Sequence, residues 1–182
     1  LSKTHNFEYN IAVPHNIIGP KQKYDDAYRN VASIMINLIL QNRRPVIYGD
    51  GNQKRCFSDI QDCITPLEKL IIDPKIVSET VNIGPDEETV TINELFNLIS
   101  NKLKFNQKPV FHKKRPNEVY KAICSSKKAR EVLEYDTKVS LSDSLDNMID
   151  YIKKKGPKEF QYNYELEIKT DVTPDTWSKK LF

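Results

Sequence analysis

The sequence predicts an α/β domain of modest sheet content. Short segments rich in β-branched residues alternate with longer ones whose apolar residues recur every three to four positions. These segments do not follow a strict strand–helix–strand order, so we expect a small mixed sheet rather than a fully parallel one. The 182 residues are enough for one domain, and 38% hydrophobic with 29% charged residues is typical of a globular protein.

The first half of the chain is expected to alternate between strands and helices. In order, we expect a strand at 7–13, a helix at 26–41, a strand at 45–48 and a helix that begins near Phe57. The tight turn Gly49-Asp50-Gly51 separates the last two of these elements. Pro66 is expected either in the first turns of the last helix or at a kink, because proline removes a backbone donor.

The second half continues the alternation and ends in a tail. In order, we expect a strand at 80–83, a helix from Thr91, a strand at 109–112, a helix at 126–133 and a long helix from Ser140. Thr91 and Glu94 have the spacing of a capping box, in which two side chains satisfy backbone N–H groups at a helix start. The stretch after Gly156-Pro157 is aromatic, and we expect it to be an extended tail that wraps over the domain.

The composition excludes several classes of function. A net charge of +3, from 28 basic and 25 acidic residues, is too balanced for nucleic-acid binding through bulk charge. The longest apolar stretch, near 34–40, is too short to cross a membrane. The three cysteines form no CxxC pair, which favours a reducing cytoplasmic compartment over a disulfide framework. The three histidines are far apart in the sequence, so no metal site is expected.

Three stretches carry candidate ligand-binding residues. The glycine turn delivers Arg55, whose planar fork can bond two phosphate oxygens, although composition alone favours a hairpin turn with a surface arginine. Pro116 stiffens the loop that presents Arg115 and Glu118, either to a diphosphate and a ribose or as an exposed ion-paired loop. Tyr48 is expected either to stack on a nucleobase or to be a half-buried strand residue.

The sequence contains neither a dinucleotide-binding fingerprint nor a convincing catalytic pair. Its only Gly-x-Gly is Gly49-x-Gly51, and Lys54 stands where the third glycine would be. Tyr151 and Lys155 have Tyr-x-x-x-Lys spacing, but they lie at the end of an amphipathic helix, where lysines complement the helix dipole. We therefore assign them no catalytic role.

Taken in order, these motifs resemble the C-terminal half of extended short-chain dehydrogenase/reductases. The resemblance covers about residues 7–155 and is to UDP-glucose 4-epimerase-like members of the NAD-dependent epimerase/dehydratase family. The matching segments are His15–Pro20, Tyr48–Gly51, Gln53–Phe57, Asn82–Gly84, Arg115–Glu118, and 126–133 with Ser140-Leu141. Each segment is weak alone, whereas six in family order are a strong signal. The tail resembles an extension found in a subset of bacterial sugar-nucleotide epimerases.

The resemblance implies a small mixed substrate-binding domain together with the last strands of a Rossmann-type fold whose main NAD-binding part is absent. Residues 1–20 would be the remnant of the Rossmann domain, residues 21–155 the nucleotide-sugar-binding domain and residues 156–182 the extended tail. The strand at 7–13 would then lack neighbours, and unpaired strand edges invite association. We therefore expect residues 1–20 either to be held by a second polypeptide that carries the missing half or to pair with a symmetry copy of this chain. In both cases the rest of the chain would leave Ile11 and Val13 uncovered.

The resemblance also implies a binding role for seven residues, none of them catalytic. They are Asn16 at the sugar-diphosphate, Asn30 and Val31 at the nucleotide, Tyr48 at the base, Arg55 and Arg115 at the diphosphate, and Glu118 at the ribose. Val13, Cys56 and Gln61 depart from the family pattern, which leaves the identity of the sugar and of the reaction open.

By the same resemblance, the expected function is the nucleotide-sugar-binding portion of an NAD-dependent sugar-nucleotide 4-epimerase. The missing N-terminal domain would bind NAD and carry the catalytic residues, so the chain alone is expected to be inactive. The expected partners are a UDP-linked nucleotide sugar and the missing Rossmann half or a second chain, with a homodimer in the intact enzyme and neither nucleic acid nor membrane. Two alternatives stay open: part of a UDP-glucuronic acid decarboxylase or 4,6-dehydratase, and a non-catalytic nucleotide-binding or assembly module.

Overall fold

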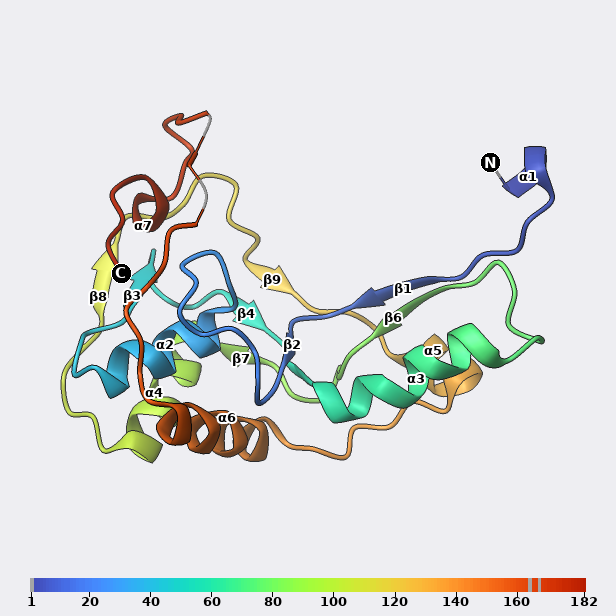
Figure 1. Cartoon of the computed structure of the whole chain (residues 1–182), viewed down its shortest axis with the longest axis horizontal. Coiled ribbons are helices and arrows are strands. Elements are labelled where there is room, and N and C mark those ends of the chain that lie inside the picture. Colours follow the sequence, from blue (N-terminus) through green and yellow to red (C-terminus); the bar gives the residue numbers. More distant parts are fainter. Residues whose placement is uncertain (1, 164, 167) are drawn as a thin grey trace.

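The structure is a computed structural model that describes residues 2–163, 165–166 and 168–182. The helices are α1 (Ser2–His5), α2 (Val31–Leu40), α3 (Ile60–Ile72), α4 (Ile92–Leu103), α5 (Lys127–Leu133), α6 (Leu141–Lys155) and α7 (Asp175–Ser178). The strands are β1 (Ile11–Pro14), β2 (Ile17–Ile18), β3 (Val46–Tyr48), β4 (Lys54–Arg55), β5 (Ser58–Asp59), β6 (Thr80–Ile83), β7 (Val90–Thr91), β8 (Val110–His112) and β9 (Lys121–Ala122). Figure 1 shows two regions, one built around α2, α4 and α6, the other around β1, β6, α3 and α5. The predicted α/β class is confirmed.

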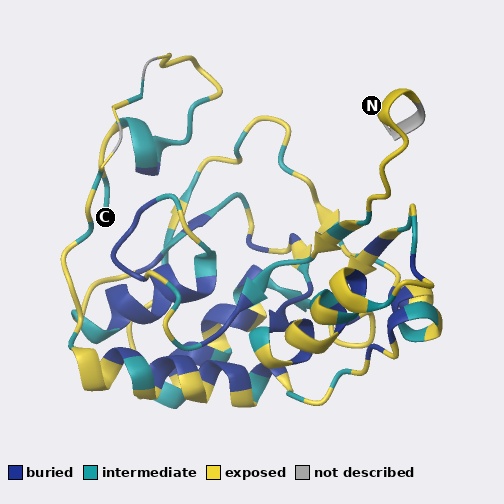
Figure 2. Ribbon diagram, turned by 45° about the vertical axis from the view of Figure 1, so that its right-hand side comes forward, coloured by how far each residue is buried: buried dark blue, intermediate teal, exposed yellow. Residues whose placement is uncertain are grey.

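The centre of the first region is α2, because its residues are apolar on nearly all sides. Every residue from 32 to 39 is buried, as expected for a helix inside a core rather than on a surface. The other two helices each pack one apolar face against the core, with Leu95 and Ile99 on α4 and with Leu145 and Met148 on α6. Their other faces are exposed, so α4 and α6 form the outer layer (Figure 2).

Polar caps set the positions where these helices begin. The Thr91–Glu94 capping box is present at the start of α4, as predicted, and Ser140 caps α6. The prediction for α2 was wrong at its start, which is Val31 rather than residue 26. Asn30 takes an extended backbone with ψ 139° and its side chain accepts the Ala32 N–H at 3.0 Å, so the chain before it forms turns instead.

The second region is a two-stranded parallel sheet with helices on one face. β1 pairs with β6, and α3 and α5 cover the face that carries Val81 and Ile83, which are both fully buried. Ile11 and Val13 on the other face are 46% and 40% exposed. The rest of the chain therefore leaves the face of β1 that carries Ile11 and Val13 uncovered. The N-terminal part of the chain before β1 runs outward from the body (Figure 2).

Several short elements escape prediction, and most of them fix loops. The strands predicted at 45–48 and 109–112 are present as β3 and β8, which pair in parallel. The sequence did not predict the other short strands: β2 pairs with β5 in parallel, and β4 lies between β7 and β9. The tail contains the short helix α7 instead of being extended throughout. Pro66 lies in the middle of α3 rather than in its first turn. In this position proline removes one backbone hydrogen bond of the helix.

Candidate functional site

A pocket of about 200 Å³ opens beside the start of α2. Its other walls are β3, β4 with the residues that follow it, the loop after β8, and α7. All seven residues that the sequence marks as binding candidates line it: Asn16, Asn30, Val31, Tyr48, Arg55, Arg115 and Glu118. The structure thus brings together side chains that are as far apart in the sequence as Asn16 and Glu118, although their role as substrate contacts stays a prediction.

A cluster of Arg55, Arg115 and Glu118 forms the charged part of the pocket. Arg55 Nη2 donates to Glu118 Oε1 at 3.0 Å. Arg115 donates through Nε to Oε2 at 2.5 Å and through Nη2 to Oε1 at 2.7 Å. The Glu118 side chain is only 5% exposed, a degree of burial that a carboxylate tolerates when it is paired and hydrogen-bonded.

This cluster has the chemistry of a diphosphate site with room for a hydroxyl. Two guanidinium groups and one carboxylate leave one net positive charge, and each arginine has five N–H donors, only some of which are used by Glu118. Glu118 accepts three hydrogen bonds from the arginines, while a carboxylate offers about four lone-pair positions. The carboxylate can therefore align both arginines and still accept one hydrogen bond from a hydroxyl group of a ligand.

The glycine turn positions Arg55 by its backbone conformation. Gly49 and Gly51 have φ of +66° and +75°, the left-handed region that favours glycine. A side chain at Gly51 would also collide with that of Asn93. The Gln53 amide donates to the Tyr48 carbonyl at 3.1 Å and closes the turn, so that β4 begins immediately and carries Arg55 into the pocket.

Asn16 and His15 follow β1 and have structural partners. Asn16 has a positive φ of 44°, and its Nδ2 donates to the Cys56 carbonyl at 2.9 Å. That bond leaves its side-chain oxygen as the group that a ligand would meet. His15 Nε2 lies 3.0 Å from the Ala122 carbonyl, which gives this residue a structural contact outside the pocket lining.

The start of α2 contributes Asn30 and Val31. The capping bond to Ala32 uses the Asn30 side-chain oxygen, so a ligand would meet its NH2 group. The N-terminal end of a helix carries partial positive charge. This end of the pocket therefore favours an electron-rich ligand group, in agreement with the predicted nucleotide contact.

Sequence reasoning missed the residues that the tail adds to the pocket: Thr176, Trp177 and Phe182. Tyr48 meets this segment directly, because its hydroxyl donates to Thr176 Oγ1 at 3.0 Å. The Arg115 guanidinium lies over the Tyr48 ring, 5.0 Å from its centroid. The aromatic composition of the tail was the only signal in the sequence, and nothing in it indicated where the tail would dock.

The Tyr151–Lys155 pair lies on α6, as predicted, and is not among the residues that line this pocket. Tyr151 packs against the helical core and Lys155 is exposed at the helix end. Across residues 2–163, 165–166 and 168–182, no helix has the length and hydrophobicity of a membrane span. The same ranges hold no group of three His, Cys, Asp or Glu side chains arranged to bind a metal ion.

Comparison with known proteins identifies relatives of this chain. It matches the model of the NAD dependent epimerase/dehydratase family over residues 1–84. A protein of Methanocaldococcus jannaschii assigned as a UDP-glucose 4-epimerase is 32% identical over 155 residues, which are 85% of this chain and 49% of that protein. An uncharacterized UDP-glucose epimerase of Bacillus subtilis is 32% identical over 136 residues, 75% of this chain and 42% of the relative. The chain spans about half the length of the curated relatives it matches.

Solved structures of UDP-sugar 4-epimerases share the fold of this chain. The UDP-glucose 4-epimerase of Thermotoga maritima, crystallised with UDP-glucose, has a TM-score of 0.76 and 26% identity over 85% of this chain and 48% of its own. The UDP-glucuronic acid 4-epimerase of Bacillus cereus, in complex with UDP-glucuronic acid and NAD, has a TM-score of 0.77 and 28% identity with the same coverage. The resemblance inferred from the order of the motifs is confirmed: the NAD dependent epimerase/dehydratase family model matches the N-terminal part of the chain, and relatives named as UDP-glucose 4-epimerases match about 85% of it.

Proposed function

We propose that this chain is the nucleotide-sugar-binding portion of an NAD-dependent sugar-nucleotide 4-epimerase. The observation that supports this proposal is the convergence of all seven candidate residues on one pocket. The relatives named as UDP-glucose epimerases and the neighbour that holds UDP-glucose favour a UDP-linked sugar as the ligand.

The diphosphate, the ribose and the sugar end of the ligand would each have a partner in the pocket. The diphosphate would take the N–H donors of Arg55 and Arg115 that Glu118 does not use, since guanidinium–phosphate pairs are strong and can be bidentate. A ribose hydroxyl would donate to Glu118, and the Asn16 side chain would meet the sugar-diphosphate end. Such contacts hold the sugar in place and lower the entropic cost of reaching the reacting geometry.

NAD supplies the hydride acceptor and donor in this chemistry, and the residues of this chain do not fit a cradle for it. The sequence has no Gly-x-Gly-x-x-Gly fingerprint after a strand. We propose that a further polypeptide segment holds NAD and the proton-transfer groups and covers the open face of β1 at Ile11 and Val13. Without that segment the chain would bind nucleotide but turn over no substrate.

Isothermal titration calorimetry of the full chain with UDP tests the binding proposal. Arg55→Ala is expected to weaken UDP binding by about 10- to 100-fold, because a charge-assisted hydrogen bond contributes about 1.5–3 kcal/mol. Lys127→Ala is the matched control: it also removes one positive charge, from an exposed side chain on α5. Equal affinities for the two variants, or no binding of UDP to the unmodified chain, would contradict the proposal.

A further inference from the structure

The C-terminal segment 174–182 closes one side of the pocket. It contains α7, which lies beside β3 and β8 (Figure 1). Thr176, Trp177 and Phe182 all line the pocket, and Thr176 is 3% exposed. The segment is therefore a wall of the pocket rather than a loose end near it.

Two hydrogen bonds fasten this wall to the predicted base-contacting residue. The Tyr48 hydroxyl donates to Thr176 Oγ1 at 3.0 Å and accepts from the Thr176 backbone N–H at 2.8 Å. The Arg115 guanidinium already covers the Tyr48 ring at 5.0 Å. With its hydroxyl bound to Thr176 and a guanidinium over its ring, Tyr48 has less aromatic surface to offer a nucleobase than the sequence suggested.

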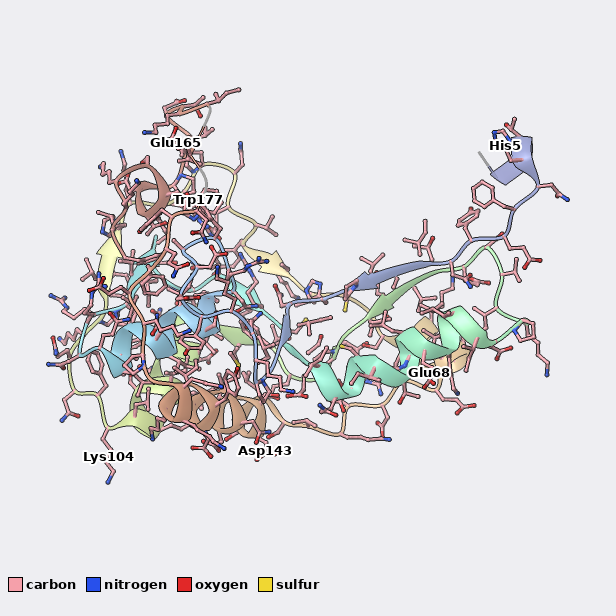
Figure 3. All side chains as sticks on the ribbon, in the orientation of Figure 1. His5, Glu68, Lys104, Asp143, Glu165 and Trp177 are labelled. Atoms are coloured by element: carbon pink, nitrogen blue, oxygen red, sulfur yellow. The ribbon has the colours of Figure 1, made fainter. Side chains whose placement is uncertain are left out.

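Trp177 offers the aromatic surface that Tyr48 has lost. Its Nε1–H donates to the Ala27 carbonyl at 3.1 Å. Its ring meets the edge of Tyr28 at a centroid distance of 5.3 Å and an interplanar angle of 63°. These two contacts hold the indole in one orientation, so a ligand would find it already in place. Figure 3 shows the position of Trp177 at α7.

We propose that the segment 174–182 forms the nucleobase subsite of this pocket, with Trp177 in contact with the base and Thr176 positioning Tyr48. The inference rests on the proposed function and deepens it. The three side chains through which the segment lines the pocket are uncharged, and the carboxylate of the adjacent Asp175 is already paired with Lys179 at 3.2 Å, so the segment offers no free positive charge to a diphosphate through these residues. The phosphates would therefore lie at Arg55 and Arg115, and the uncharged, aromatic base against α7.

Trp177 is the only tryptophan of the chain, so its fluorescence reports on this subsite in the unmodified protein. UDP is expected to change the Trp177 emission saturably, with the same dissociation constant as calorimetry gives. Inorganic pyrophosphate, which carries the charged part alone, is expected to leave the emission unchanged. An equal change with pyrophosphate would place phosphate against Trp177 and overturn the inference.

Variants test the energetic part of the same proposal. Trp177→Ala is expected to weaken UDP binding about tenfold or more, because stacking on an aromatic side chain contributes substantially per base. Trp177→Phe keeps a flat ring and should lose less than Trp177→Ala does. The control Val172→Ala changes a half-exposed residue of the same tail that is not part of the pocket lining and should bind UDP as the unmodified chain does.

The outcomes separate this inference from the proposed function. If UDP binds and depends on Arg55, but neither the emission of Trp177 nor its replacement by alanine matters, the subsite is wrong and the nucleotide-sugar site stands. If UDP does not bind the unmodified chain, both are wrong.

Discussion

Replacing Asn37 with leucine should strongly destabilise the protein. Asn37 is fully buried on α2 and makes three hydrogen bonds outside the helix. Its Nδ2 donates to the Tyr24 carbonyl at 3.0 Å and to the Lys158 carbonyl at 2.8 Å, and its Oδ1 accepts the Lys158 N–H at 3.0 Å. Leucine is similar in size but leaves all three backbone groups without this partner.

The expected loss of stability follows from these three hydrogen bonds. At about 1 kcal/mol net for each hydrogen bond, the free energy of unfolding should fall by about 3 kcal/mol. With a urea dependence of about 2 kcal/mol/M, the urea midpoint should fall by about 1.5 M at an unchanged slope.

The matched control is Gln41→Ala, because Gln41 donates to the same Lys158 carbonyl at 2.8 Å but from an exposed position. A surface change of this kind should cost less than about 0.5 kcal/mol. If the Asn37→Leu midpoint stays within about 0.3 M of the unmodified chain, at a comparable slope, the buried hydrogen bonds of Asn37 do not contribute the expected stability.

Two further predictions concern titration and capping. Burial raises the pKa of the Cys63 and Cys124 thiols to about 11; at pH 8 iodoacetamide should therefore label the folded chain far more slowly than the urea-unfolded chain. Since the unfolded thiols ionise first, the free energy of unfolding should fall as pH rises from about 9 towards 11, and urea titrations that show a constant or rising value over that range would refute this. Thr91→Ala should remove about 1 kcal/mol of stability by breaking the capping box at α4, while Thr91→Ser keeps the hydroxyl and should retain most of it; equal loss in both variants would rule out capping as the cause.

Sequence patterns predicted the parts of the fold that depend on local chemistry. The capping box at Thr91 and the cap at Ser140 define helix starts within a few residues, and both appear where expected. The start of α2 failed because Ala27 is buried at helical spacing without being helical. Burial there comes from the loop packing against the core, which periodicity alone does not distinguish from a helix.

The pocket was predictable only in its residue types. Arg55, Arg115 and Glu118 were chosen by chemistry and by motif order, and their meeting depends on β4 and the loop after β8. The wall formed by Thr176 and Trp177 was not predictable, because its position is set by contacts with residues far away in the chain. A four-residue helix such as α7 also carries too little periodicity to be recognised.

The bond between Tyr48 and Thr176 joins residues 128 positions apart. Closing so long a loop carries an entropic cost that must be met before the contact contributes any stability. The helical core around α2, α4 and α6 encloses apolar residues that come together without the tail. A nascent chain can therefore collapse around that core and still lack a complete pocket, because one wall forms only when the segment 174–182 docks.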